Sequence, residues 1–174
     1  HEHAVLYVER VRQQAQAKEP SENHREPQNG FLAGASPGNG EDGHDAVAVD
    51  LPSEDVSAGW WDYADTVVHT LGERSDLVVV GHSLGGFTAP LVCARVPAEL
   101  LVLVAAKVHS PGELFADWWT NAGYEESGYE DVFYHDVPPA LAVEARRRER
   151  GEDSKALQEP WPLAAWPDVP TRYL

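Results

Sequence analysis

The 174-residue sequence contains no methionine and a single cysteine. A complete reading frame begins with methionine, so a chain that begins at His1 is expected to be incomplete or processed. One cysteine forms no internal disulfide, which fits a reducing compartment or a protein indifferent to the redox state of its compartment. We therefore expect a cytoplasmic protein, and a signal segment removed upstream of His1 would leave no trace in this sequence.

Basic residues are scarce, because 13 Lys and Arg stand against 29 Asp and Glu, giving a formal net charge of −16. Nucleic acids and anionic lipid surfaces bind clustered Lys and Arg, so this composition argues against both kinds of partner. Long apolar runs are also missing, and none approaches the roughly 20 residues that span a bilayer. The hydrophobic fraction of 43% suits a globular domain with a core.

The first 42 residues differ in composition from the remainder of the chain. Four apolar residues predict a short helix over residues 1–18: Val5, Tyr7, Val8 and Val11. Residues 19–42 are rich in Glu, Asn, Pro and Gly, which is typical of a linker or loop. We therefore divide the chain into an atypical, weakly ordered segment over 1–42 and a partial α/β domain over 43–174.

Strand and helix signals alternate from residue 43 onward. Strands are predicted at 46–50, 77–80 and 100–108, and helices at 60–71 and 86–96. Gly72 would end the first helix, and Pro90 is placed in the first turn of the second. Continuous apolar strands separated by helices favour a parallel sheet with helices on both faces, which is the α/β class.

Residues 109–170 lose this alternation and carry many aromatic, acidic and proline residues. A helix is predicted over 140–150, and residues 169–174 have the composition of a further strand. Because that strand has only begun when the chain stops, it is a second indication that the chain is incomplete.

A glycine-rich turn connects the strand at 77–80 to the helix that follows it. The residues Gly-His-Ser-Leu-Gly-Gly at 81–86 match G-x-S-x-G, in which a strand reverses sharply into a helix and exposes Ser83. Gly81 and Gly85 would avoid collisions on either side of the serine. The Leu84 N–H would face the oxygen of a reacting carbonyl group. A plain glycine-rich turn is the alternative, whereas a phosphate-binding loop would need a lysine after the glycines.

These residues resemble the α/β-hydrolase fold enzymes, and within them the small esterase branch. That branch contains plant methylesterases, hydroxynitrile lyases and bacterial esterases. The segments that carry the resemblance are 43–51, the nucleophile segment VGHSLGG at 80–86, 100–108 and 169–174, with 109–168 similar to the inserted cap.

The resemblance implies Ser83 as the nucleophile and the Leu84 N–H as an oxyanion donor. It also implies four residues that support the turn: Gly81, His82, Gly85 and Gly86. The expected substrate is a small carboxylic ester, which would pass through an acyl-enzyme without a cofactor or metal.

The chain also departs from the family pattern. Family members place the catalytic acid and then the histidine on loops after the late strands, which would lie beyond Leu174. The second oxyanion donor comes from a loop near the start of the domain, for which residues 31–36 (FLAGAS) are the one weak candidate. We therefore expect this chain to be inactive or impaired on its own.

Several residues within the chain are alternative participants. His109 is a candidate base because it follows a strand at the carboxyl end of the sheet, with a plain cap histidine as the alternative. His135 is a weaker candidate, better explained as a local pair with Asp136. Carboxylates that would orient such a base are Asp117, Asp131 and Asp136. Candidates for the wall of an acyl or aromatic substrate pocket are Trp118, Trp119 and Phe133.

The remaining candidates favour structural roles. Cys93 is expected to be a small buried hydrophobe, and His1 with His3 to form no metal site. The main alternatives to an esterase are a catalytically silent fragment or ligand-binding module of the same fold, and hydroxynitrile lyase chemistry on the same serine. Without a first strand the sheet would have an exposed edge, so self-association is also expected.

Overall fold

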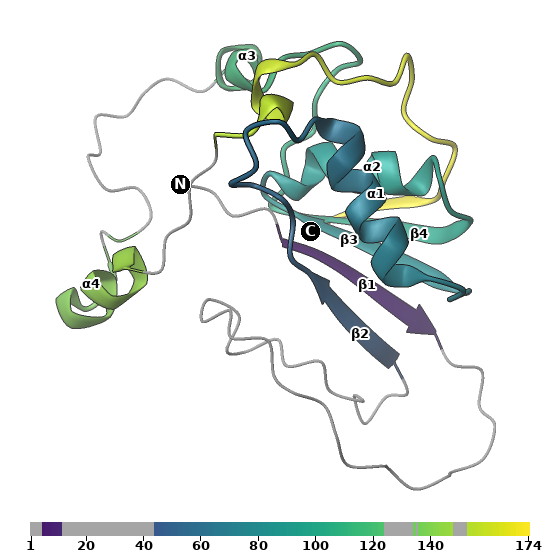
Figure 1. The fold of residues 1–174 in the computed structure, drawn as a ribbon, viewed down its shortest axis with the longest axis horizontal. Helices are drawn as coiled ribbons and strands as arrows, with labels where there is room; N and C mark the ends of the chain where they lie inside the picture. The colour runs from purple at the N-terminus through teal and green to yellow at the C-terminus, as the bar shows by residue number, and fades with distance from the viewer. Residues whose placement is uncertain (1–4, 12–43, 124–133, 135, 148–152) are drawn as a thin grey trace, which may run out of the picture.

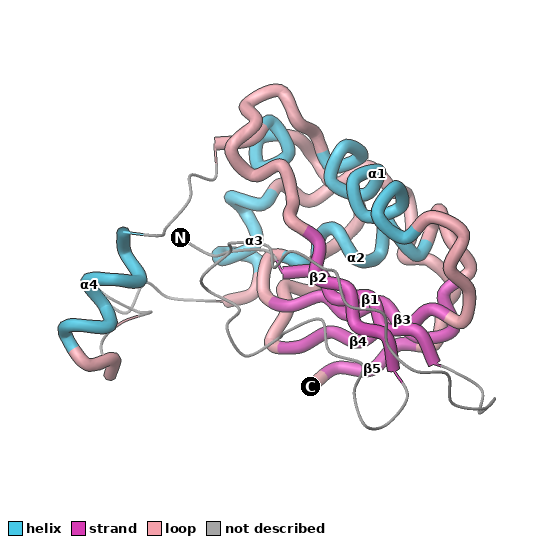
Figure 2. The backbone as a smooth tube through the Cα atoms, turned by 60° about the horizontal axis from the view of Figure 1, so that its bottom comes forward, coloured by secondary structure: helices cyan, strands magenta, loops and turns pink. Residues whose placement is uncertain are grey.

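A computed structural model describes residues 5–11, 44–123, 134, 136–147 and 153–174, and every structural statement concerns these residues. They form one five-stranded sheet with helices packed against it (Figures 1 and 2). In chain order the elements are β1 (Val5–Val11), β2 (His44–Val49), α1 (Trp60–Leu71), β3 (Leu77–His82), α2 (Gly85–Cys93), β4 (Ala98–Val104), α3 (Phe115–Asn121), α4 (Pro139–Arg147), the 3-10 helix η1 (Lys155–Gln158) and β5 (Thr171–Tyr173).

The sheet is mixed and has the strand order β2-β1-β3-β4-β5. Its second half is parallel, because β3 pairs with β4 and β4 pairs with β5 in that sense. β1 is antiparallel to both of its neighbours, β2 and β3. The predicted strands at 46–50, 77–80 and 169–174 are therefore confirmed within a residue or two of their bounds.

The expected helix over residues 1–18 is wrong, because Val5–Val11 forms a strand. Apolar residues spaced by three fit a helical pattern, but the run VLYV is rich in the β-branched and aromatic types that favour strands. Pairing with β2 on one side and β3 on the other supplies the backbone hydrogen bonds of this segment. Within the described strands, β1 therefore lies inside the sheet, and β2 and β5 form its edges.

Helices α1 and α2 pack on each other and lie over one face of the sheet (Figure 2). The apolar side of α1 is buried as its periodicity predicted, and Gly72 ends the helix with φ +57°. The Trp60 ring stacks on the Phe87 ring of α2 with centroids 5.0 Å apart. The sheet contributes alternate residues to this core, among them Leu77 and Val79 of β3.

Two predicted bounds along this part of the chain need correction. Helix α2 begins at Gly85, so Pro90 lies in the helix interior and not in its first turn. Strand β4 ends at Val104, four residues before the predicted end, because Ala105 takes a φ of +42° and turns the chain away. The same turn is joined to β5 by a hydrogen bond from the Ala105 N–H to the Leu174 carbonyl, 2.9 Å long.

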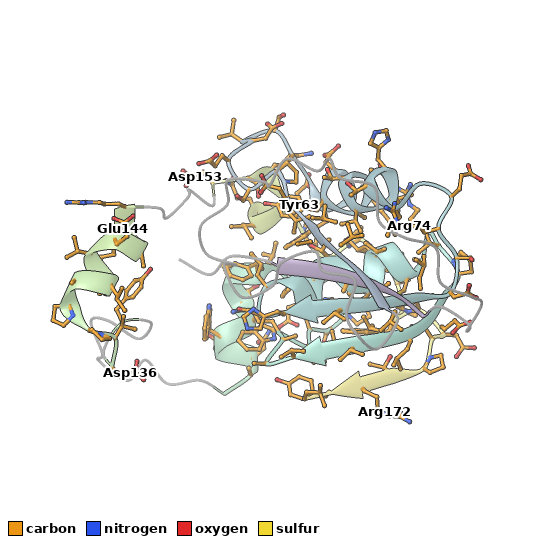
Figure 3. All side chains as sticks on the ribbon, turned by 90° about the horizontal axis from the view of Figure 1, so that it is seen from below. Tyr63, Arg74, Asp136, Glu144, Asp153 and Arg172 are labelled. Atoms are coloured by element: carbon orange, nitrogen blue, oxygen red, sulfur yellow. The ribbon has the colours of Figure 1, made fainter. Side chains whose placement is uncertain are left out.

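Residues 153–170 return from the predicted cap region across the helical layer. Their attachment relies on buried hydrogen bonds, because the Trp161 indole N–H donates to the Phe87 carbonyl at 2.8 Å. Tyr63 on α1 lies beside η1 (Figure 3), and its hydroxyl bonds that of Ser154 at 2.8 Å. Helix α4, predicted over 140–150, lies apart from the sheet in Figures 1 and 3. Within the described parts of the cap segment, residues 153–170 are thus fastened to the core by these bonds.

Candidate functional site

The turn at Ser83 connects β3 to α2 and holds an unusual backbone conformation. Ser83 has φ +51°, a left-handed value that costs a non-glycine residue of order 1 kcal/mol or more. Gly81 permits this turn, since a Cβ there would lie 2.7 Å from the Gly85 carbonyl oxygen and 2.9 Å from the Ala89 Cβ. A side chain at residue 81 would therefore push the strand and the helix apart.

The last residue of β4 and the loop that follows it, residues 105–109, hold the Ser83 turn through their backbone. The Ser83 N–H donates to the Val104 carbonyl at 3.3 Å, and the Lys107 N–H donates to the Ser83 carbonyl at 2.9 Å. Gly86 is required beside this loop, because a Cβ there would collide with the Lys107 carbonyl oxygen. The strained φ of Ser83 is thus sustained by contacts from a neighbouring strand end.

The N-terminus of α2 presents backbone donors next to Ser83. The Leu84 N–H donates to no acceptor within the described residues, whereas the Gly86 N–H bonds the Ser83 carbonyl at 3.1 Å. Helix dipoles add partial positive charge at this end. Ser83 itself is partly exposed, and within the described part of the chain its hydroxyl makes no hydrogen bond. The hydroxyl and the free N–H therefore lie on adjacent residues of one turn.

His109, the candidate base, is buried among three aromatic rings. Its ring centroid lies 4.0 Å from that of Phe87, 4.3 Å from that of Trp161 and 5.1 Å from that of Trp166. Burial lowers the pKa of His109 from 6.5 to about 4, so the imidazole is neutral at neutral pH.

Both ring nitrogens of His109 face carbonyl oxygens. Nε2 lies 3.3 Å from the Gly86 oxygen, and Nδ1 lies 3.4 Å from the Ser110 oxygen. Neither nitrogen therefore contacts the Ser83 hydroxyl, and this geometry favours a structural histidine over a general base.

Trp118 and Trp119 lie side by side on α3 with ring centroids 5.1 Å apart. The Trp118 indole N–H donates to the Val108 carbonyl at 2.8 Å, which fixes α3 beside the loop that holds Ser83. The buried Lys107 side chain extends over these rings, with Nζ 4.4 Å from the Trp119 centroid. The two tryptophans proposed for a pocket wall therefore contact the loop 105–109, while Phe133 lies outside the described residues.

The other candidate residues are scattered. His82 is exposed at the end of β3, and Asp117 and Asp136 are exposed on separate segments. Cys93 is half-buried at the end of α2, and burial raises the pKa of its thiol to about 12, so the thiolate is disfavoured. Candidates that fall outside the described residues are His1, His3, residues 31–36, Asp131 and His135.

The described residues contain no cluster of His, Cys, Asp and Glu suited to a metal ion, and among the described helices none has the length and apolarity to traverse a bilayer. An open depression of about 510 Å³ lies over the outer side of α1 and is lined by polar residues that include Asp55, Asp62 and His69. Ser83 does not line it. The chemically distinctive group in the described fold is therefore the Ser83 turn.

The sequence did not predict the residues that surround His109, or the buried Lys107 whose side chain lies over the tryptophans of α3. Trp161 and Trp166 lie 52 and 57 residues after His109, and no local pattern predicts such contacts. Their spacing in a proline-rich segment, EPWPLAAWPDVP, is unlike a helix or strand face. This proline-rich composition is the one feature of the sequence that marks Trp161 and Trp166 as residues that anchor the segment. Lys107 lies near the end of an apolar run, and nothing in that run indicates where its side chain packs.

A parallel strand of the mixed sheet turns sharply at a strained serine into a buried helix. These features place the chain in the class of α/β proteins with a serine at the strand–helix turn. The sequence model of the alpha/beta hydrolase family matches residues 28–174. The chain therefore belongs to the alpha/beta hydrolase family. Searches of curated proteins and of solved structures found no match to it.

Proposed function

We propose that this alpha/beta hydrolase is a serine hydrolase of small carboxylic esters, in which Ser83 attacks the ester carbonyl. The observation that carries the proposal is the φ of +51° at Ser83, on a turn that exposes the side chain at the N-terminus of α2. Backbone strain of this kind is retained at sites where a side chain must take a fixed direction. The half-exposed hydroxyl is reachable by a small substrate.

In the proposed cycle, the Ser83 oxygen forms a bond to the ester carbon as the Ser83 proton passes to a base. The negative charge that develops on the carbonyl oxygen is stabilised by the Leu84 N–H, which has no acceptor in the described residues. Collapse releases the alcohol, which takes the proton, and leaves an acyl-enzyme that water hydrolyses. The resemblance assigns the base and its carboxylate to loops after residue 174, and this assignment stays a prediction.

The esterase reaction is favoured over a ligand-binding module because a strained serine gives no advantage to a passive pocket. The aromatic pair Trp118 and Trp119, bound to the loop that holds Ser83, supports a substrate with an apolar acyl or alcohol group. The acidic composition favours neutral esters over anionic ones, since a net charge of −16 repels anions.

A fluorophosphonate probe tests the proposal, because its fluoride leaves without a proton, so that the one proton a base must take is that of the Ser83 hydroxyl. With imidazole added as the base, we expect an adduct on Ser83 in the purified chain, located by intact mass and peptide mapping, and none in Ser83→Ala. Added imidazole accelerates the labelling if the base is supplied from outside these residues, and leaves the rate unchanged if a base is present. A folded chain that stays unlabelled with imidazole would contradict the proposal.

A further inference from the structure

Helix α2 contains an interior proline immediately after its contact with Ser83. Pro90 has no N–H, so it cannot make the helical hydrogen bond to the carbonyl four residues earlier, which is that of Gly86. The proline ring also crowds that carbonyl group. The first turn of α2 therefore presents a buried carbonyl oxygen whose helical donor is missing.

His109 occupies the position of the missing donor. Its Nε2 lies 3.3 Å from the Gly86 oxygen in a buried contact. The oxygen opposite Nδ1 belongs to Ser110, and it already accepts the Glu113 N–H at 3.1 Å. A neutral imidazole carries one N–H. A proton on Nδ1 would leave the buried Gly86 oxygen without this donor, whereas a proton on Nε2 costs less, because the Ser110 oxygen already accepts another N–H. The Nε2–H tautomer follows from this comparison.

We infer that Pro90 and His109 act together as positioning residues for Ser83: Pro90 leaves the Gly86 carbonyl open, and the His109 Nε2–H binds it. This contact fixes the loop 105–109 against the first turn of α2. The inference rests on the proposed function, because it assigns these residues to the placement of its nucleophile.

The contact between His109 and the Gly86 carbonyl affects the position of Ser83, because the loop 105–109 also binds Ser83 directly. The Lys107 N–H binds the Ser83 carbonyl at 2.9 Å, and the Lys107 carbonyl packs on Gly86. If the His109 contact is lost, the loop and with it the φ of Ser83 are free to relax. Misplacement of a reacting group by about 1 Å can cost about a hundredfold in rate. The loss should fall on kcat, because the contact fixes the position of the nucleophile, and the His109 ring packs against Phe87, Trp161 and Trp166 and not against the tryptophans of α3.

The tautomer of His109 is a readout that needs no activity. In ¹⁵N-labelled protein we expect the His109 imidazole to carry its proton on Nε2. In Pro90→Ala the new N–H of residue 90 competes for the Gly86 oxygen, so the Nε2 resonance should shift. Pro97→Ala, outside the helix, is the matched control and should leave it unchanged. A proton on Nδ1 in the unsubstituted protein, or an identical spectrum for Pro90→Ala, would overturn the inference.

Kinetics with a p-nitrophenyl ester separate positioning from packing. His109→Phe keeps an aromatic ring but has no donor, and we expect its kcat to fall about tenfold to a hundredfold with little change in KM. His109→Gln places an amide N–H at a similar reach and should recover most of that loss. Equal losses in the two variants, or an unchanged kcat in His109→Phe, would contradict the inference. His69→Phe on the exposed side of α1 is the control.

The two readouts also separate this inference from the proposed function. If Ser83→Ala hydrolyses the ester as fast as the unsubstituted protein, then the proposed function fails and the tautomer result still decides the His109 contact. If His109→Phe fails to fold, the spectra of Pro90→Ala and Pro97→Ala carry the test.

Discussion

The buried His109 predicts a specific loss of stability in acid. Its pKa falls from 6.5 to about 4 mainly because burial among the rings of Phe87, Trp161 and Trp166 disfavours the charged form, while contacts with the Ser110 and Gly86 carbonyls and the charge of Glu113 oppose that shift. Between these two pH values the unfolded chain binds the proton and the folded chain does not. Stability therefore rises with pH in this window and is lost as pH falls from about 6.5 toward 4.

The size of the effect follows from the two pKa values. The two pKa values differ by about 2.5, which lowers the unfolding free energy at pH 4 by about 3 kcal/mol relative to pH 7. Urea unfolding followed by tryptophan fluorescence measures the free energy at each pH. Carboxylates titrate in the same range, so the quantity to compare is the difference between the unsubstituted protein and His109→Phe.

We expect that difference to shrink by about 3 kcal/mol between pH 7 and pH 4, because phenylalanine does not titrate. The phenylalanine variant is expected to be less stable at pH 7, where it loses the donor to the Gly86 carbonyl. Parallel pH profiles for the two proteins would refute the claim that a neutral imidazole is buried in this cluster.

Three packing predictions are accessible to the same unfolding measurement. Gly86→Ala drives a Cβ into the Lys107 carbonyl and should cost about 1–3 kcal/mol, whereas Gly112→Ala, where a Cβ meets open space, should cost about 1 kcal/mol from its positive φ. Trp161→Phe removes the donor to the Phe87 carbonyl and should cost about 1–3 kcal/mol; no loss would show that the return segment is not anchored there. Tyr63→Phe leaves the buried Ser154 hydroxyl without its partner and should cost about 1–2 kcal/mol.

The parts of the fold that sequence predicted are those encoded by neighbouring residues. Helix α1 has a clear apolar face and a glycine at its end, and β3 is a short apolar run before the G-x-S-x-G turn. These features depend on period and on turn chemistry within about a dozen residues. The Ser83 turn was predicted for the same reason, since its glycines and its serine lie within five positions.

The parts that sequence did not predict depend on distant partners. Residues 5–11 fit either a helix or a strand, and the choice is made by pairing with β2 and β3, some 40 and 70 residues away in the register. The aromatic surroundings of His109 come from α2 and from a segment more than 50 residues later. The early end of β4 at Val104 depends on the positive φ of Ala105, and an apolar run gives no signal of such a turn.

Trapping the acyl-enzyme would decide whether Ser83 is the nucleophile. The protein is mixed with p-nitrophenyl acetate, quenched in acid and digested, and the peptides are examined by mass spectrometry beside those of Ser83→Ala. We expect one acetyl group on Ser83 and none at that peptide in the variant. An acetyl group that appears equally in both proteins, or a folded protein that hydrolyses the ester without acetylation of Ser83, would contradict this assignment.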